Sequence, residues 1–197
     1  LASSPGANVE DCVHTLGLVI RLRIHVGSVE SARRALVALR AVLAEKDDLM
    51  QGQLYEGLLV AADGQYDAAR RSFARVICHL CKCKAPDADA DTFSEPELPP
   101  TWWHHTCEGQ PNRVLVDAAV NYAVCTVHCG HLQAAIKTLQ DLIRGDPAGR
   151  ATREVLFNLC TLYDLAFDPS GSRRRKMVLR HLAEQFGVHL HSTAYRL

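Results

Sequence analysis

Residues 64–73 read Gly-Gln-Tyr-Asp-Ala-Ala-Arg-Arg-Ser-Phe, and two other segments repeat their pattern. Residues 27–36 read Gly-Ser-Val-Glu-Ser-Ala-Arg-Arg-Ala-Leu, and residues 130–139 read Gly-His-Leu-Gln-Ala-Ala-Ile-Lys-Thr-Leu. Each segment has a glycine, then an apolar residue, an alanine and a second large apolar residue at fixed spacing. These residues are Gly27, Val29, Ala32 and Leu36; Gly64, Tyr66, Ala69 and Phe73; and Gly130, Leu132, Ala135 and Leu139. Such a recurrence predicts a chain built from similar structural units.

Each position in the pattern has a physical reason that points to a helical hairpin. Glycine takes the left-handed conformation that ends a first helix without strain. Alanine lets two helices cross closely, and the apolar residue four positions later lies on the same helix face. Apolar residues at helical spacing precede each glycine and indicate the first helices. They are Val13, Leu16 and Ile20; Leu54, Leu58 and Ala61; and Val116, Val120, Ala123 and Val127. The second helices are expected at about 29–43, 66–80 and 132–144.

The spacing of the glycines places a long insertion in the chain. Gly27 and Gly64 stand 37 residues apart (64 − 27), whereas Gly64 and Gly130 stand 66 apart (130 − 64). Residues 84–112 are rich in proline and acidic residues and lack helical periodicity. We therefore predict hairpins at about 9–46, 47–83, 113–147 and 148–186, with an insertion at 84–112. Residues 1–8 form a flexible start in this prediction, and residues 187–197 an irregular tail.

The fourth hairpin is less regular than the others. Its first helix is expected around Val155 to Tyr163, and residues 168–171 (Asp-Pro-Ser-Gly) are expected to form a widened turn. The apolar residues predicted to bury the second helix are Val178, Leu179, Leu182 and Phe186. This unit is expected to cap the stack, because terminal repeats need a polar outer face.

Composition favours helices and excludes several classes of function. Hydrophobic residues make up 48% of the 197 residues and aromatic residues 6%, so we expect an all-α fold. A formal net charge of zero disfavours nucleic acid as a partner. The apolar runs fall short of the roughly 20 residues that span a bilayer, so a cytoplasmic chain is expected. The start at Leu1 rather than Met favours a fragment of a longer protein or a processed start.

Residues from about 9 to 186 resemble the tetratricopeptide-repeat superfamily, and residues 64–73 lie close to its consensus. Pro147 also stands seventeen residues after Gly130, where that repeat places its closing proline. The resemblance implies a right-handed α–α superhelix of about four hairpins. Such repeat proteins bind other proteins, and loops between repeats gather on one face.

Residues 113–165 resemble more narrowly the carboxy-terminal repeats of the subunit-twelve family of the trafficking protein particle (TRAPP) complex. The residues that carry this likeness are Asn121-Tyr-Ala-Val-Cys125, Gly130, Leu132, Asp146-Pro147 and the run Val155-Leu-Phe-Asn-Leu-Cys-Thr-Leu-Tyr-Asp-Leu165. The likeness implies an architectural subunit for vesicle tethering, with other subunits of the complex as partners. It further implies that any association with Golgi or other endomembranes takes place only through the complex.

A zinc site is one candidate for chemistry in the chain. Cys78, Cys81 and Cys83 close the second hairpin, and His104, His105 and Cys107 lie across the insertion. A folded-back loop would give tetrahedral ligands, but Cys78 and Cys81 fall on a helix end rather than in a tight turn. Packed, reduced thiols are the alternative, as for Cys125, Cys129 and Cys160 in the first helices. We expect neither a metal nor a cofactor, and no catalytic motif is visible.

Three groups of residues are candidates for partner binding. Trp102 and Trp103, with Leu98, either dock on the repeat itself or anchor a partner subunit. Arg173, Arg174 and Arg175 begin a basic run that either contacts an acidic partner or membrane surface or is a solvated face. Asn121 lies at an inner position of a first helix. The pairs Arg33-Arg34 and Arg70-Arg71 share one repeat position and are expected to face solvent.

Three functions follow from these residues. The first is a scaffold in a multisubunit trafficking assembly, with no enzymatic activity. The second is a chaperone adaptor that holds a peptide carboxylate, which requires Lys, Asn and Arg at inner first-helix positions. Those positions hold Arg21, Tyr55, Leu58, Asn121 and Val124, a set that is mostly apolar, so this function has little support. The third is a zinc-containing regulatory module.

Overall fold

The computed structural model describes residues 9–44, 49–83, 98–99, 102–104 and 113–188, and all regular structure in these ranges is helical. The all-α prediction is therefore confirmed. The α-helices are α1 (Val9–His25), α2 (Val29–Ala44), α3 (Leu49–Ala62), α4 (Tyr66–Leu80), α5 (Arg113–His128), α6 (Leu132–Gly145), α7 (Pro147–Arg150), α8 (Arg153–Ala166) and α9 (Pro169–Gln185). A short 3-10 helix, η1, spans Trp102–His104.

The three turn glycines have the left-handed backbone that the repeat pattern predicts. Their φ angles are +77° at Gly27, +78° at Gly64 and +90° at Gly130. After each glycine, the next N–H donates to the carbonyl five residues earlier, the bond that defines a Schellman motif. These bonds join Ser28 to Arg23, Gln65 to Val60 and His131 to Thr126, at 2.7, 3.1 and 3.0 Å. The same geometry thus ends α1, α3 and α5 and starts α2, α4 and α6.

The repeated alanine and apolar positions form the interior of these hairpins. Ala32, Ala69 and Ala135 have no exposed surface, which fits close crossing of neighbouring helices. Leu36, Phe73 and Leu139 are buried beside them. The buried apolar residues form two clusters, a smaller one in α1, α2 and α3 and a larger one from α3 to α9. The two clusters meet in α3.

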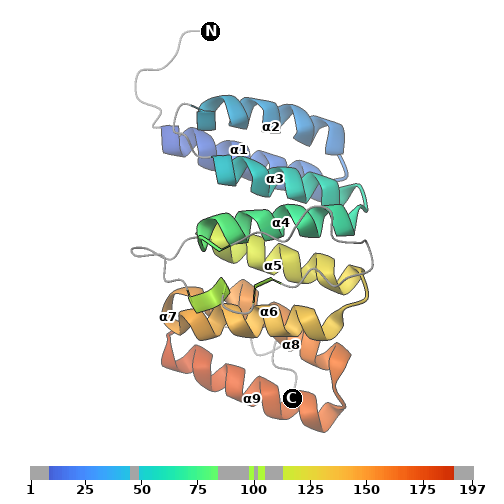
Figure 1. Ribbon diagram of the computed structural model, residues 1–197, viewed down its shortest axis with the longest axis vertical. Helices are drawn as coiled ribbons and strands as arrows, with labels where there is room; N and C mark the ends of the chain where they lie inside the picture. Colours follow the sequence, from blue (N-terminus) through green and yellow to red (C-terminus); the bar gives the residue numbers. More distant parts are fainter. Residues whose placement is uncertain (1–8, 45–48, 84–97, 100–101, 105–112, 189–197) are drawn as a thin grey trace.

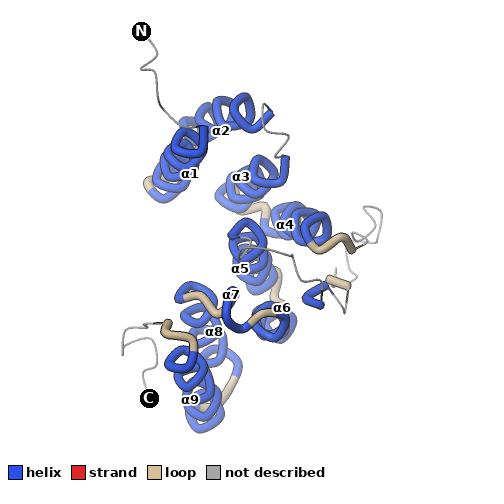
Figure 2. Tube along the Cα trace, turned by 90° about the vertical axis from the view of Figure 1, so that its left-hand side faces the viewer, coloured by secondary structure: helices blue, strands red, loops and turns tan. Residues whose placement is uncertain are grey.

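The helices stack along the long axis of the molecule, from the α1–α2 pair at one end to α9 at the other (Figure 1). Viewed from the side, α1, α3, α5 and α8 follow a shallow arc that opens to the left, while α4 and α6 lie to its right and α2 lies at the top (Figure 2). Within the described ranges, no helix combines the length and the apolar character needed to cross a bilayer.

The last two helices differ from the sequence prediction at two points. Asp168 is the N-cap of α9, and its carboxylate accepts from the backbone N–H groups of Ser170 and Gly171 at 3.2 and 3.4 Å. The predicted widened turn at 168–171 is therefore wrong, because these residues form a cap and the first helical turn. Val178 was expected to be buried but is exposed, because Leu179 and Ala183 supply the buried face of α9.

Pro147 follows the end of α6 at Gly145, but it also begins a helix of its own. Asp146 caps α7 by accepting from the Gly149 N–H at 3.0 Å, and proline at the first helical position is favoured there. The described part of the insertion is likewise not wholly irregular, since it contains η1, which lies against α6. In Figure 2, η1 sits on the side of α4 and α6, away from α1 and α8.

Candidate functional site

The arc of α1, α3, α5 and α8 contains a hollow of about 450 Å³, which we call the concave groove. Its wall includes Arg21 from α1, Asp117 and Asn121 from α5, and Thr152 and Glu154 at the start of α8. These residues come from the first, third and fourth hairpins. The groove thus exists only because successive hairpins stack in register.

An ion pair crosses the groove from the first hairpin to the third. The Arg21 guanidinium lies 2.5 Å from the Asp117 carboxylate and 5.7 Å from the centre of the Tyr55 ring. Burial alone would lower the pKa of Arg21, but Asp117 and Tyr55 outweigh it and hold that pKa above its usual value. Gly17 leaves room for the Tyr55 side chain, because a Cβ at this glycine would lie 2.1 Å from the Tyr55 hydroxyl.

Large apolar side chains lie exposed beside the polar wall of the groove. On a helix, residues three or four apart are neighbours on one face. By that spacing Leu18 adjoins Arg21, Val124 adjoins Asn121 and Phe157 adjoins Glu154. All three apolar side chains are exposed, as are Leu22 and Leu165, which continue the same faces of α1 and α8. The groove therefore presents apolar and charged groups side by side.

Asn121 lies in the groove, but its side chain is partly engaged. Its amide Nδ2 donates to the Asp117 carbonyl at 2.7 Å. Asn158 donates in the same way to the Glu154 carbonyl at 2.8 Å. Each amide carbonyl, and the second amide hydrogen, stays available for a ligand.

Leu98 and Trp102 dock on this chain's own helices, over α4, α5 and α6. Both are buried, and they share a cavity wall with residues of those helices. Trp103 is half-buried; the Arg144 guanidinium lies 5.5 Å from its ring, and its carbonyl accepts from Arg150 at 3.5 Å. A Cβ at Gly145 would lie 2.3 Å from that carbonyl oxygen, so glycine permits the close approach. Trp102 thus belongs to the protein's own core, whereas Trp103 keeps part of its ring at the surface.

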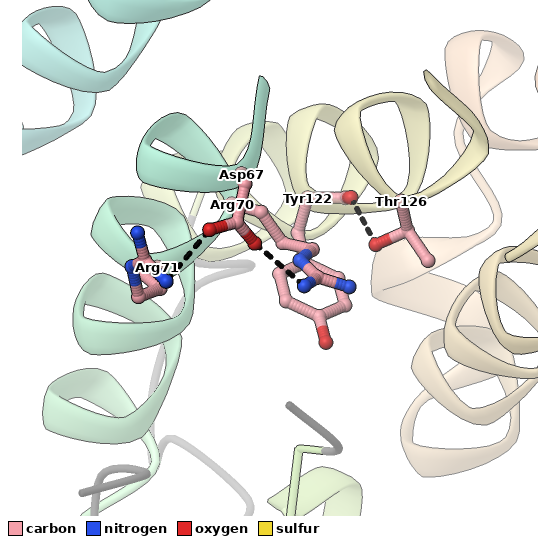
Figure 3. Close-up of polar contacts among 5 residues, drawn as sticks. All are labelled: Asp67, Arg70, Arg71, Tyr122 and Thr126. Atoms are coloured by element: carbon pink, nitrogen blue, oxygen red, sulfur yellow. Dashed lines mark hydrogen bonds and ion pairs between the residues drawn. The ribbon is translucent and has the colours of Figure 1, made fainter. Parts of the chain in front are cut away.

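Arg70 is buried, and the prediction that it faces solvent is wrong. Its exposed surface is 4%, and its guanidinium donates to Asp67 at 2.7 Å, while Asp67 also pairs with Arg71 at 2.6 Å (Figure 3). Arg33, at the same position of the first repeat, is exposed and pairs with Asp63. The difference arises because α5 and α6, with Leu98 and Trp102, enclose the side chain of Arg70.

The cysteines lie in several environments. Cys78, Cys81, Cys125 and Cys160 are buried, and Cys83 and Cys129 are half-buried. Burial raises the pKa of Cys125 and of Cys160 to about 11, and burial together with Cys83 raises the pKa of Cys78. Such thiols are protonated and poorly nucleophilic at neutral pH.

The zinc candidates do not assemble in the described part of the chain. Across the residues that the structure describes, no three His, Cys, Asp or Glu side chains come together as a metal cluster. His105 and Cys107 lie outside the described residues, and His104 is placed only by its backbone in η1.

The basic run lies on α9, at the far end of the stack. Arg173, Arg174 and Arg175 are all exposed, and the Arg175 guanidinium lies 3.7 Å from the centre of the Phe167 ring. Lys176 is buried and bonds to the Asp164 carboxylate at 2.5 Å. The predicted partner-binding residues therefore occupy three separate places, namely the groove, the α4–α6 surface and α9. Arg21 was placed at an inner first-helix position, but its pairing with Asp117 and the place of Phe157 were missed, because these contacts appear only once the repeats are stacked.

Comparisons with protein-family models, with curated proteins and with solved structures found no match for this chain. The tetratricopeptide and TRAPP resemblances therefore rest on the residues quoted above.

Proposed function

We propose that this chain is a tetratricopeptide-type scaffold that holds a segment of another protein in the concave groove. The observation that supports this most is that the exposed apolar side chains Leu18, Val124 and Phe157 each lie one helical turn from a residue of the groove wall. Exposed apolar groups that gather on one face mark interaction surfaces. The proposal includes a right-handed superhelix. The curved arrangement of α1, α3, α5 and α8 in Figure 2 supports a superhelical stack.

The partner we propose is another subunit of a vesicle-tethering assembly of the TRAPP kind, at Golgi or other endomembranes. The support is the resemblance of residues 113–165. In this role the chain is architectural and performs no catalysis. The buried, high-pKa thiols of Cys125 and Cys160 favour packing over nucleophilic roles.

A chaperone adaptor is a weaker proposal for the same groove. It requires several cations and amides aimed at a terminal carboxylate. Arg21 is instead paired with Asp117, and the Asn121 amide donates to its own helix. Acidic C-terminal peptides are thus expected to bind no better than scrambled ones, which a fluorescence titration would measure. No such observation favours the zinc module.

The groove is tested by placing charge on the apolar side chains beside its wall. Phe157→Glu with Leu18→Glu places two carboxylates among the exposed apolar groups, at sites 53% exposed in both cases, so the fold should tolerate them. Val37→Glu, at an exposed residue of α2, a helix that contributes no residue to the groove wall, is the matched control. The measurement is retention of named TRAPP subunits in affinity purification, with identical tags and expression.

We expect the wild type and Val37→Glu to retain those subunits equally, and the double variant to lose at least nine-tenths of them. Equal retention by the double variant would remove the groove from the proposal. Absence of those subunits from every sample, including the wild type, would remove the TRAPP assignment instead.

A further inference from the structure

The burial of Arg70 needs an explanation that packing does not give. In the repeat pattern, Arg33, Arg70 and Ile136 follow the buried alanines and occupy one equivalent position. Ile136 is buried there in the third hairpin, so the fold accepts a purely apolar side chain at this point. A buried charge is costly where an apolar residue would pack as well. The presence of arginine at this position of the second hairpin therefore points to a use for its charge.

The hydrogen bonds of Arg70 are incomplete. One terminal nitrogen donates to Asp67, but Nε, which is buried, has no acceptor among the described residues. Asp67 divides its charge between Arg70 and the exposed Arg71. A buried guanidinium whose donors are not all paired favours the entry of an acceptor beside it.

A cavity of about 50 Å³ lies beside this side chain. Arg70 from α4, Thr126 from α5, and Thr138 and Asp141 from α6 line it, and Trp102 with Leu98 closes one side. A water needs about 10–15 Å³ of such space, so the cavity has room for roughly three water-sized groups. That is the size of one carboxylate group. The short helix η1, whose Trp102 lines the cavity, lies on the side of α4 and α6, away from α1 and α8 (Figure 2).

The charges around the cavity select an anion with a single negative charge. Asp141 on the wall is already paired with Arg144 at 2.7 Å and with Lys137 at 3.6 Å. On the cavity wall itself, the two cations Arg70 and Lys137 stand against the single carboxylate of Asp141. The surplus is positive, yet the nearby Asp141 carboxylate disfavours a phosphate dianion through repulsion.

The two threonines of the wall add no free hydroxyl donors. Thr126 Oγ1 donates to the Tyr122 carbonyl at 2.7 Å, and Thr138 Oγ1 donates to the Ala134 carbonyl at 2.9 Å. The hydrogens of the two threonines are thus committed, and Arg70 is the buried cation of the wall, since the side chain of Lys137 is 64% exposed. A planar guanidinium matches a planar carboxylate, because two parallel N–H groups can donate to its two oxygens.

We propose that the cavity between α4, α5, α6 and Trp102 is a binding site for one carboxylate group, held by Arg70. The carboxylate belongs either to a free small acid or to the terminus of a peptide. This site is separate from the concave groove, so its test does not depend on the proposed scaffold function.

The test follows the side-chain Nε–Hε resonances of arginine in ¹⁵N-labelled protein. Sodium acetate is titrated against sodium chloride at constant ionic strength. Arg33, at the equivalent position of the first repeat, is the internal control because its side chain is 45% exposed. Comparison with Arg70→Lys identifies the Arg70 resonance, and N-acetylglycine and phosphate are titrated in parallel.

We expect acetate to shift the Arg70 resonance saturably, with a dissociation constant in the millimolar range for so small a ligand. Arg33 should show only the linear response common to exposed arginines, and phosphate should bind at least tenfold more weakly. Tighter binding of N-acetylglycine than of acetate identifies a peptide terminus as the ligand, and the reverse order identifies a free acid.

Arg70→Ile supplies an independent readout, because isoleucine already occupies this position in the third hairpin. Acetate should raise the Tm of the wild type and leave that of Arg70→Ile unchanged. A wild-type Arg70 resonance that shifts no more than that of Arg33 would overturn the site, whatever the stability of the variant. Stronger binding of phosphate than of acetate would overturn its assignment to a carboxylate.

Discussion

Lys176 carries a charge at a place where only 1% of its surface is exposed, and one carboxylate compensates it. Asp164 accepts from Lys176 at 2.5 Å and from the Ser172 hydroxyl at 2.6 Å. Partial burial raises the pKa of Asp164, but these two bonds outweigh it and hold that pKa below its usual 3.8. Because Asp164 is itself 55% exposed, water screens part of the interaction. We expect Asp164→Asn to lower the free energy of unfolding by about 1–2 kcal/mol at pH 7, in urea titrations.

The sign of the pH dependence follows from the lowered pKa of Asp164. Its contribution is fully present above the usual pKa and is lost as the pH falls through the lower folded value. The gap between wild type and Asp164→Asn should therefore close below about pH 4. Glu184→Gln, which breaks the exposed Arg180–Glu184 pair on the same helix, is the control, with an effect under about 0.5 kcal/mol. Equal effects of the two substitutions would show that Lys176 does not need its partner.

At the scale of the element, replacing either of two glycines in α3 by alanine should change the stability in opposite directions. A Cβ at Gly57 would lie 2.7 Å from the ring of Phe73, which is fully buried and cannot move aside. A Cβ at Gly52 would meet Arg40 and Leu43 at 3.6 Å, an ordinary contact. Gly57→Ala should therefore destabilise the protein by about 1–3 kcal/mol through overpacking. Gly52→Ala should stabilise it by about 0.5–1 kcal/mol, because alanine favours the helix.

Thermal and urea unfolding of the two variants, with matched circular dichroism spectra, measure this pair. The same helix, residue type and substitution are used, so helix propensity cancels between them. A shift in the same direction for both would mean that the close approach of α3 to α4 at Phe73 does not govern the packing of this hairpin.

The elements themselves follow largely from local signals in the sequence. Gly27, Gly64 and Gly130 marked the ends of first helices, and the expected second helices at 29–43, 66–80 and 132–144 lie within one residue of α2, α4 and α6. The prediction of a turn at Asp168-Pro169 was wrong, because proline and glycine after an aspartate are found in loops and also in an N-cap followed by a first helical turn. Periodicity also overcounted the buried face of α9 by including Val178.

The candidate sites depend on contacts that no local pattern contains. Arg21 and Asp117 are far apart in sequence and meet only across α3. Arg70 looks like Arg33 in the repeat pattern, and its burial depends on α5, α6 and Trp102. The one available signal was the change from arginine to Ile136 at the equivalent position, which marks that position as facing inward in the third hairpin.

At the scale of the whole molecule, the two apolar clusters divide the stack at α3. Leu54 belongs to the larger cluster, whereas Tyr55 and Leu59 belong to the smaller cluster with α1 and α2. Leu58 packs against both clusters and joins them. In a linear stack each hairpin is stabilised mainly by its neighbours, so a terminal pair with a small core opens most easily. The Arg21–Asp117 pair is a direct polar link from this terminal pair to the larger body.

Native-state hydrogen exchange in low urea should therefore resolve two opening steps. Amides of α1 and α2 should exchange through an opening of smaller free energy and smaller urea dependence than amides of α4, α5 and α6. Asp117→Ala should lower the first free energy by up to about 1 kcal/mol, the range of a partly exposed ion pair, and leave the second nearly unchanged. A single opening free energy shared by α2 and α6 would show instead that Leu58 couples the two clusters into one cooperative unit. The groove would then gain its rigidity from the core beneath it rather than from the ion pair across it.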